Sequence, residues 1–255
     1  VSYIAHTLPN VECVYALCGK DDVFGQRLES AFSKALCHVP DGSSSVNLQD
    51  DILGLILDNI AAQLTVNNTN SNLSFMLLGL SGGGRTTRRN TLNVVLELVS
   101  DRNFVLSPQT SSTATKCFEL LYRVCELGSN ESLPANVQSQ VLRLMNKLRR
   151  THFWQNQIVC YLGQGPSTQS IFHEISTTFS VGFGSDAELS RRNNDVLHSI
   201  AWLLKGVAIE LFSLVGQQDK MSGLMMLSSG KFNHHLQSLL ACLLTHSNSL
   251  LLTAL

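Results

Sequence analysis

The feature that most constrains the fold is a long apolar pattern between residues 196 and 215, which repeats every three to four residues. Its members are Val196, Leu197, Ile200, Leu203, Leu204, Val207, Ala208, Leu211, Leu214 and Val215. Trp202 and Ile209 fall on a second face of the same pattern. Because this period is that of an α-helix, the spacing predicts one long helix with neighbours on more than one side.

Shorter patterns with the same period recur along the chain and predict further helices. One helix is expected from Asn47 to Val66. Four later segments each carry an apolar stripe with helical spacing. These stripes are Leu92, Val95, Leu96 and Val99; Phe118, Leu121, Tyr122 and Cys125; Val137, Val141, Leu144, Met145 and Leu148; and Leu236, Leu239, Leu240, Leu243 and Leu244. A second face beside Phe118 is also apolar, with Cys117, Leu120, Val124 and Leu127. We therefore expect an all-α fold, an irregular α-solenoid of stacked antiparallel helical hairpins of the HEAT or armadillo kind, as a single segment over residues 1–255.

The composition favours a surface that other protein covers. Charged side chains make up 15% of the chain, against about 25% in ordinary soluble domains. The formal net charge of -1 excludes bulk attraction to nucleic acid or to an anionic membrane. Residues 232–255 lack Asp, Glu, Lys and Arg, but polar residues from Thr245 to Ser249 interrupt them, so we expect no transmembrane span. Because the chain begins at Val1 and not at Met, we expect a segment of a longer protein.

The glycine-rich residues 79–86 carry two patterns that are typical of enzymes. The first is G-x-S-x-G around Ser81, the turn between a strand and a helix that presents a nucleophilic serine. Its partners would be Asp186 or Asp195 with His234, His235 or His246. The second differs from the Walker phosphate loop by Arg85 in place of lysine. The strands that either site needs are missing around it, so we expect instead a short helix through Leu80, capped by Asn70 or Ser71, with Gly82–Gly84 as its exit.

The remaining polar residues indicate no metal or cofactor site. The seven cysteines form no C-x-x-C pair and are interpreted as reduced core thiols, and the eight histidines are scattered. A basic segment with Arg143, Lys147, Arg149 and Arg150 precedes His152, Phe153 and Trp154, which is also the pattern of a nucleic-acid patch. Basic residues at the end of a helix, followed by core aromatic residues, explain this segment better, and we expect no direct contact with nucleic acid.

Four segments, taken in their order and spacing, resemble a known family. They are NLSFMLLGL from Asn72 to Leu80, KCFELLYRVCEL from Lys116 to Leu127, LRRTHFW from Leu148 to Trp154, and SIAWLLKGVAIEL from Ser199 to Leu211. Together they are similar to the large inner-ring scaffold nucleoporins of the nuclear pore complex. The resemblance covers roughly Asn47 to the C-terminus and implies an α-solenoid, a location at the nuclear envelope and a scaffold role in nucleocytoplasmic transport. It implies binding to other nucleoporins through short linear segments and through the end faces of the solenoid.

The expected function is therefore a structural scaffold without enzymatic activity, cofactor or small-molecule substrate. Grooves between helical hairpins would receive short amphipathic segments of partner proteins. The candidate contact residues are Phe153, Trp154 and Tyr161 on one helix and Trp202 on another, with core packing as the alternative role of each. Two other functions stay open: a HEAT-type transport receptor or adaptor outside the pore, and a serine hydrolase that uses Ser81.

Overall fold

The computed structural model describes most of the central part of the chain as helices. The described residues are 73–80, 90–107, 109–128, 133–162 and 187–216, with Arg27, Ser30, Ala31, Lys34, Gly54, Leu57, Asp58, Ile60, Ala61, Leu64 and Gln237. Among them 87% are helical and none lies in a β-strand, which confirms the all-α class for this part of the chain. The stacking of the helices as a solenoid remains a prediction.

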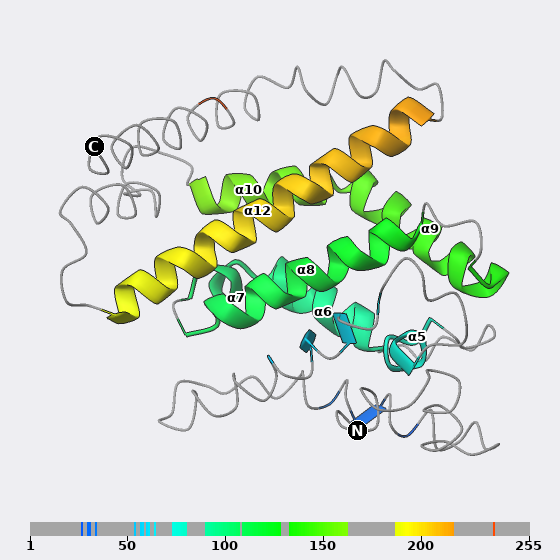
Figure 1. Cartoon of the computed structure of the whole chain (residues 1–255), viewed down its shortest axis with the longest axis horizontal. Coiled ribbons are helices and arrows are strands. Elements are labelled where there is room, and N and C mark those ends of the chain that lie inside the picture. Colours follow the sequence, from blue (N-terminus) through cyan, green and yellow to red (C-terminus); the bar gives the residue numbers. More distant parts are fainter. Residues whose placement is uncertain are drawn as a thin grey trace, which may run out of the picture. The chain divides into compact units, whose positions relative to one another are not determined.

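The chain divides into two compact units, residues Val1–Leu148 (unit 1) and Arg149–Leu255 (unit 2). Unit 1 contains α5 (Leu73–Leu77), α6 (Thr91–Ser100), α7 (Arg102–Leu106), α8 (Ser111–Leu127) and most of α9 (Ala135–Arg150). Unit 2 contains α10 (Phe153–Leu162) and α12 (Ala187–Gly216) (Figure 1). A single continuous solenoid segment over residues 1–255 stays a prediction.

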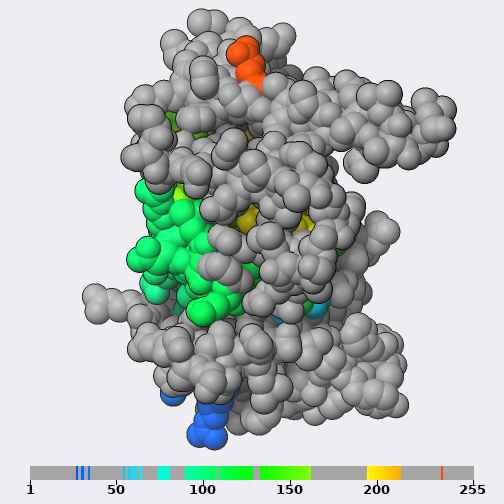
Figure 2. All heavy atoms as spheres, turned by 90° about the vertical axis from the view of Figure 1, so that its left-hand side faces the viewer, coloured from blue at the N-terminus to red at the C-terminus, as the bar shows by residue number. Residues whose placement is uncertain are grey.

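In unit 1, helix α8 packs against α6 and α7, which also pack against each other. Both expected apolar faces of α8 are buried except at Tyr122, which is partly exposed, and Cys117, Phe118, Leu120, Leu121 and Val124 have no exposed surface. The stripe of α6 is confirmed as well, because Leu92, Val95, Leu96 and Val99 are all buried. In Figure 2, green atoms of unit 1 are visible in one area of the molecular surface, at the left of the view. The core of unit 1 is thus built from helix faces with the spacing that the sequence predicts.

Helix α7 was not predicted, because its apolar pattern is too short to repeat. Asp101 ends α6, where its N–H donates to the carbonyl of Leu98, and it also begins α7. Its Oδ1 accepts a hydrogen bond from the N–H of Asn103 at 2.9 Å, the usual role of an N-cap aspartate. This single residue therefore breaks a continuous helix into two and turns Phe104 and Val105 into the core.

The end of α5 differs from the expected helix through Leu80. The helix ends at Leu77, and Gly79 adopts the left-handed conformation with φ 75°, which a residue without a Cβ reaches without strain. The N–H of Leu80 then donates to the carbonyl of Phe75 at 2.7 Å, which closes the helix end. The exit glycine is therefore Gly79, whereas Gly82–Gly84 lie outside the described residues. Gln140 of α9 donates from Nε2 to the carbonyl of Leu80 at 3.1 Å and holds this end in place.

In unit 2, α10 and α12 pack side by side and run in opposite directions (Figure 1). The long helix expected around residues 196–215 is confirmed, and Val196, Ile200, Leu203 and Val207 form its buried stripe. Trp202 and Ile209 lie partly exposed on the second face, as predicted. The expected helices over residues 47–66 and around Leu236–Leu244 fall mostly outside the described residues, although Gly54, Leu57, Asp58, Ile60, Ala61 and Gln237 are helical.

One described segment, Asn194–Ser213 of α12, is long and apolar enough to cross a membrane by length and composition. A buried helix of a soluble protein meets the same criteria, and 39% of this segment is buried. It also carries Lys205 and Glu210, whose charged forms are costly in hydrocarbon. The expected absence of a transmembrane span stays a prediction. The segment weighed for it from the sequence, residues 232–255, lies outside the described residues except for Gln237.

Candidate functional site

The four aromatic residues predicted to contact partners are placed in two different settings. Phe153, Trp154 and Tyr161 of α10 are buried, at 7%, 2% and 1% exposure. The rings of Phe153 and Trp154 meet edge to face, with centroids 5.2 Å apart and planes at 78°. Trp202 of α12 is partly exposed, and the ammonium of Lys205 lies 3.9 Å from the centre of its ring. Partner contact by these residues stays a prediction, and three of them have core positions within this chain.

The indole of Trp154 lies directly against the backbone of α12. A Cβ atom built on Gly206 would lie 2.5 Å from Cε3 and 2.7 Å from Cε2 of this ring, distances that real side chains do not tolerate. Because the ring is 2% exposed, it cannot move aside without displacing other core atoms. Gly206 thus allows a close approach of α10 and α12 and fixes which turns of the two helices face each other.

Two polar side chains of this helix pair are buried. Glu210 of α12 is 6% exposed and Gln155 of α10 is 7% exposed. Within the described part of the chain, neither the carboxylate oxygens of Glu210 nor the amide atoms of Gln155 have a hydrogen-bond partner. Gln155 follows Trp154, and Glu210 lies one helical turn beyond Gly206. Such groups are rare in folded proteins and mark a place where folding alone does not explain the residue.

Burial changes the acidity of Glu210. Loss of solvation raises the pKa of its carboxyl to about 7, and the positive charge of Arg149 opposes this rise in part. Arg149 lies just before α10, and α12 runs antiparallel to α10, so the C-terminal part of α12 faces the start of α10. Near neutral pH the carboxyl can therefore accept or release a proton. Helix α10 carries no acidic or basic side chain that could pair with this carboxyl.

Glu210 is not among the site residues predicted from the sequence, although its position in the apolar pattern could have indicated it. Glu210 follows Leu203 and Val207 at helical spacing and so falls on the buried stripe of α12. A carboxylate at such a position is almost never fully buried unless it is paired. The spacing of residues along the chain is therefore enough to place an acid within this stripe. The lack of a partner does not follow from the spacing, because it depends on residues of α10 that are distant in sequence.

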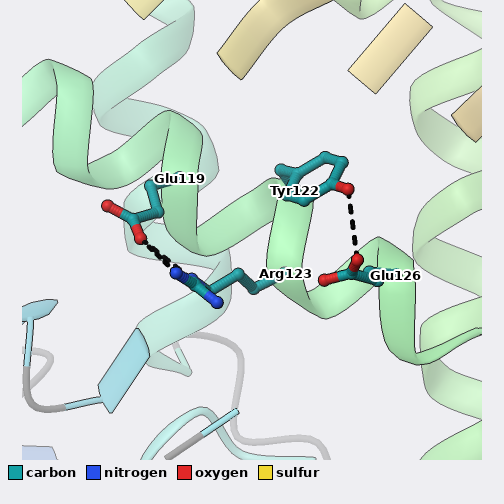
Figure 3. A network of polar contacts seen from close by, with 4 residues as sticks. All are labelled: Glu119, Tyr122, Arg123 and Glu126. Carbon is teal, nitrogen blue, oxygen red and sulfur yellow. Dashed lines mark hydrogen bonds and ion pairs between the residues drawn. The ribbon is translucent and has the colours of Figure 1, made fainter. Parts of the chain in front are cut away.

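A second polar cluster lies on α8 and consists of two separate pairs (Figure 3). Arg123 donates from Nε to Oε1 of Glu119 at 2.9 Å, and the hydroxyl of Tyr122 donates to Oε1 of Glu126 at 3.2 Å. Burial, and then the charge and hydrogen bond of Glu126, raise the pKa of Tyr122, while Arg123 opposes this. The tyrosine thus remains a hydrogen-bond donor. Pairs at this spacing stabilise a helix by about 0.3–0.5 kcal/mol each, which is a structural role.

The basic segment and three of the seven cysteines lie within the described residues, and the absence of nucleic-acid contact stays a prediction. Arg143 and Lys147 are exposed near the end of α9, but Phe153 and Trp154 are buried and offer nucleic acid no ring to stack on. Cys117 and Cys125 are buried and Cys160 is partly exposed, and none of the three forms a disulfide. Within the described ranges no three His, Cys, Asp or Glu residues are grouped to hold a metal ion.

The glycine-rich segment cannot be assigned from the structure, because Ser81 and residues 82–89 lie outside the described residues. The segment that precedes it is described, and it is the helix α5. A serine elbow or a Walker loop needs a β-strand at this position. The candidate acid Asp195 lies on α12, whereas His234, His235, His246 and Asp186 are not described.

The chain matches no known protein-family model, no curated protein and no solved structure.

Proposed function

We propose that the chain is a structural scaffold segment, which contributes helices to a protein assembly and binds short segments of other proteins. The resemblance of its four quoted segments extends the proposal to the inner ring of the nuclear pore complex at the nuclear envelope, with other nucleoporins as partners. The proposal assigns the chain no reaction, cofactor or small-molecule substrate. A solenoid stack of hairpins is part of the same proposal.

The observation that carries the proposal is the two-sided character of α12. One side is buried and packs on α10 through Gly206 and Trp154. The other side presents Ala201, Lys205, Ala208 and Phe212 to solvent, and Phe212 is 75% exposed. A large aromatic side chain with this exposure is the kind of anchor that protein interfaces bury. Low charge over the whole chain supports the same interpretation.

Crosslinking mass spectrometry on intact nuclear envelopes tests the proposal. We expect crosslinks from the exposed lysines Lys147 and Lys205 to inner-ring nucleoporins. Replacement of Phe212 by serine is expected to reduce the crosslinks of Lys205, while replacement of the exposed His198 by serine on the same helix leaves them unchanged. Crosslinks confined to soluble cargo complexes would instead favour a transport receptor or adaptor, and would contradict a scaffold role.

Self-association of the isolated chain provides an independent measurement. Because Phe212 and Leu142 are 75% and 42% exposed, we expect light scattering to show a mass that rises with protein concentration. The substitutions Phe212→Ser and Leu142→Ser together should bring the mass toward that of a monomer. A monomer at all concentrations before any substitution would count against a chain whose surface is meant to be covered.

A further inference from the structure

The buried carboxyl of Glu210 has no structural role in the packing described above. Glu210 lies one helical turn beyond Gly206, where α12 packs on α10, and the residue is 6% exposed. Its two oxygens have no hydrogen-bond partner among the described residues. An ionised carboxylate in such a place loses the solvation that it has in water, and a neutral carboxyl loses far less. A hydrophobic side chain would fill the same position at lower cost, so the acid is the feature to be explained.

We propose that Glu210 is a proton-binding site in the α10–α12 interface, and that uptake of one proton by its carboxyl tightens the packing of these two helices. We call the packed arrangement of α10 and α12 the closed state. In this state the neutral carboxyl is held away from water. When the carboxyl ionises, its hydration favours a more open arrangement of the pair. The inference concerns the helix pair itself and holds whether or not the chain is a scaffold.

The direction of the effect follows from proton linkage. In the closed pair burial raises the pKa of Glu210 from 4.5 to about 7. Between these two values the closed state binds more protons than an open, solvated state. A rise in pH through this window therefore weakens the closed state, and the weakening is complete above the upper value. A fall in pH stabilises the closed state again. Below pH 4.5 the carboxyl is protonated in both states, so the stability of the closed state changes no further.

The charged groups near Glu210 are few in the described part of the chain. Helix α10 carries no Asp, Glu, Lys, Arg or His, and its only titratable side chains are Cys160 and Tyr161. Arg149, before α10, is the residue whose charge acts on Glu210. His152, which follows Arg149 by three residues, and His198 on α12 are exposed. Asp195 and Lys205 precede Glu210 on α12. The two exposed histidines are therefore substituted one at a time in the test.

The chain contains two tryptophans, so the substitution Trp202→Phe leaves Trp154 as a reporter inside the interface. The test is to follow the quenching of Trp154 fluorescence by acrylamide in this background from about pH 5 to about pH 8.5, a range that includes the expected titration of Glu210. Quenching should rise along a one-proton curve with its midpoint close to 7. The further substitution Glu210→Gln, a neutral side chain of the same shape, should hold quenching at its low-pH level throughout.

Three further variants decide between Glu210 and its neighbours. Arg149→Gln removes the charge that favours the carboxylate, so the midpoint should move to higher pH. His152→Gln and His198→Gln should leave the curve in place. A curve that persists in Glu210→Gln, that disappears in either histidine variant, or that is absent from the Trp202→Phe chain itself would overturn the proposal. Circular dichroism of each variant at low pH verifies that the helices are formed.

Discussion

Replacement of Gly206 by alanine is expected to destabilise unit 2 by about 2 kcal/mol, although alanine is the better helix former by about 1 kcal/mol. The new Cβ would overlap the indole of Trp154, which is 2% exposed and has no room to move. The helices must therefore separate or the ring must leave its rotamer. Chemical denaturation followed by Trp154 fluorescence in the Trp202→Phe background measures the loss as a lower midpoint.

A matched control is available at another helical glycine. A Cβ on Gly54 would lie 2.9 Å from Nζ of Lys116, at the far end of a flexible side chain that can move aside. Gly54→Ala should therefore be neutral or stabilise the chain by up to about 1 kcal/mol, followed by circular dichroism. Equal losses from both substitutions would show that the cost of Gly206→Ala does not come from the ring.

A double-mutant cycle tests the contact itself. With Trp154 replaced by leucine the space beside Gly206 opens, so Gly206→Ala should no longer destabilise the chain in that background, as measured by circular dichroism. The coupling between the two sites should then be about 2 kcal/mol, the range found for residues in direct contact. Additive losses would contradict the close approach of α10 and α12 at this position.

The helices with long apolar stripes and the short helix α5 could be predicted from the sequence, whereas helix α7 could not. The stripes of α6 and α8 repeat over several turns, and burial of those faces decides where the helices lie. Helix α7 is five residues long, so it has no period to detect, and its start depends on one hydrogen bond of Asp101. The predicted end of α5 at Leu80 was wrong, because any of four nearby glycines could have ended the helix. Only the positive φ of Gly79 identifies it as the residue that does so.

The candidate site was predictable only in part, for a related reason. The sequence predicted that Trp154 and Tyr161 share a helix and that core packing was an alternative to partner contact. It could not show that Trp154 packs on Gly206, because that contact joins two helices far apart in the chain. The cost of burying Glu210 depends on the same packing, since an acid at a stripe position can also reach solvent or a basic partner. Long-range packing, and not local pattern, creates this site.

The second large effect is expected in the core of unit 1, from the substitution Phe118→Ala. Phe118 lies on α8, has no exposed surface, and belongs to the helix that packs on both α6 and α7. Loss of the ring removes buried apolar area and leaves a cavity that the surrounding helices fill only in part. We expect a destabilisation of about 4 kcal/mol, measured by circular dichroism during chemical denaturation.

A graded series separates the loss of core packing from a general effect of substitution. Phe118→Leu keeps most of the buried volume and should cost about 1 kcal/mol, well below the alanine variant. Leu142 lies on α9 with 42% exposure, so Leu142→Ala removes a similar side chain from a partly solvated place and should cost about 0.5 kcal/mol or less. If Phe118→Ala costs no more than Leu142→Ala, α8 does not form the core of unit 1. A loss that follows buried volume across the three variants would show that the two apolar faces of α8 hold this unit together.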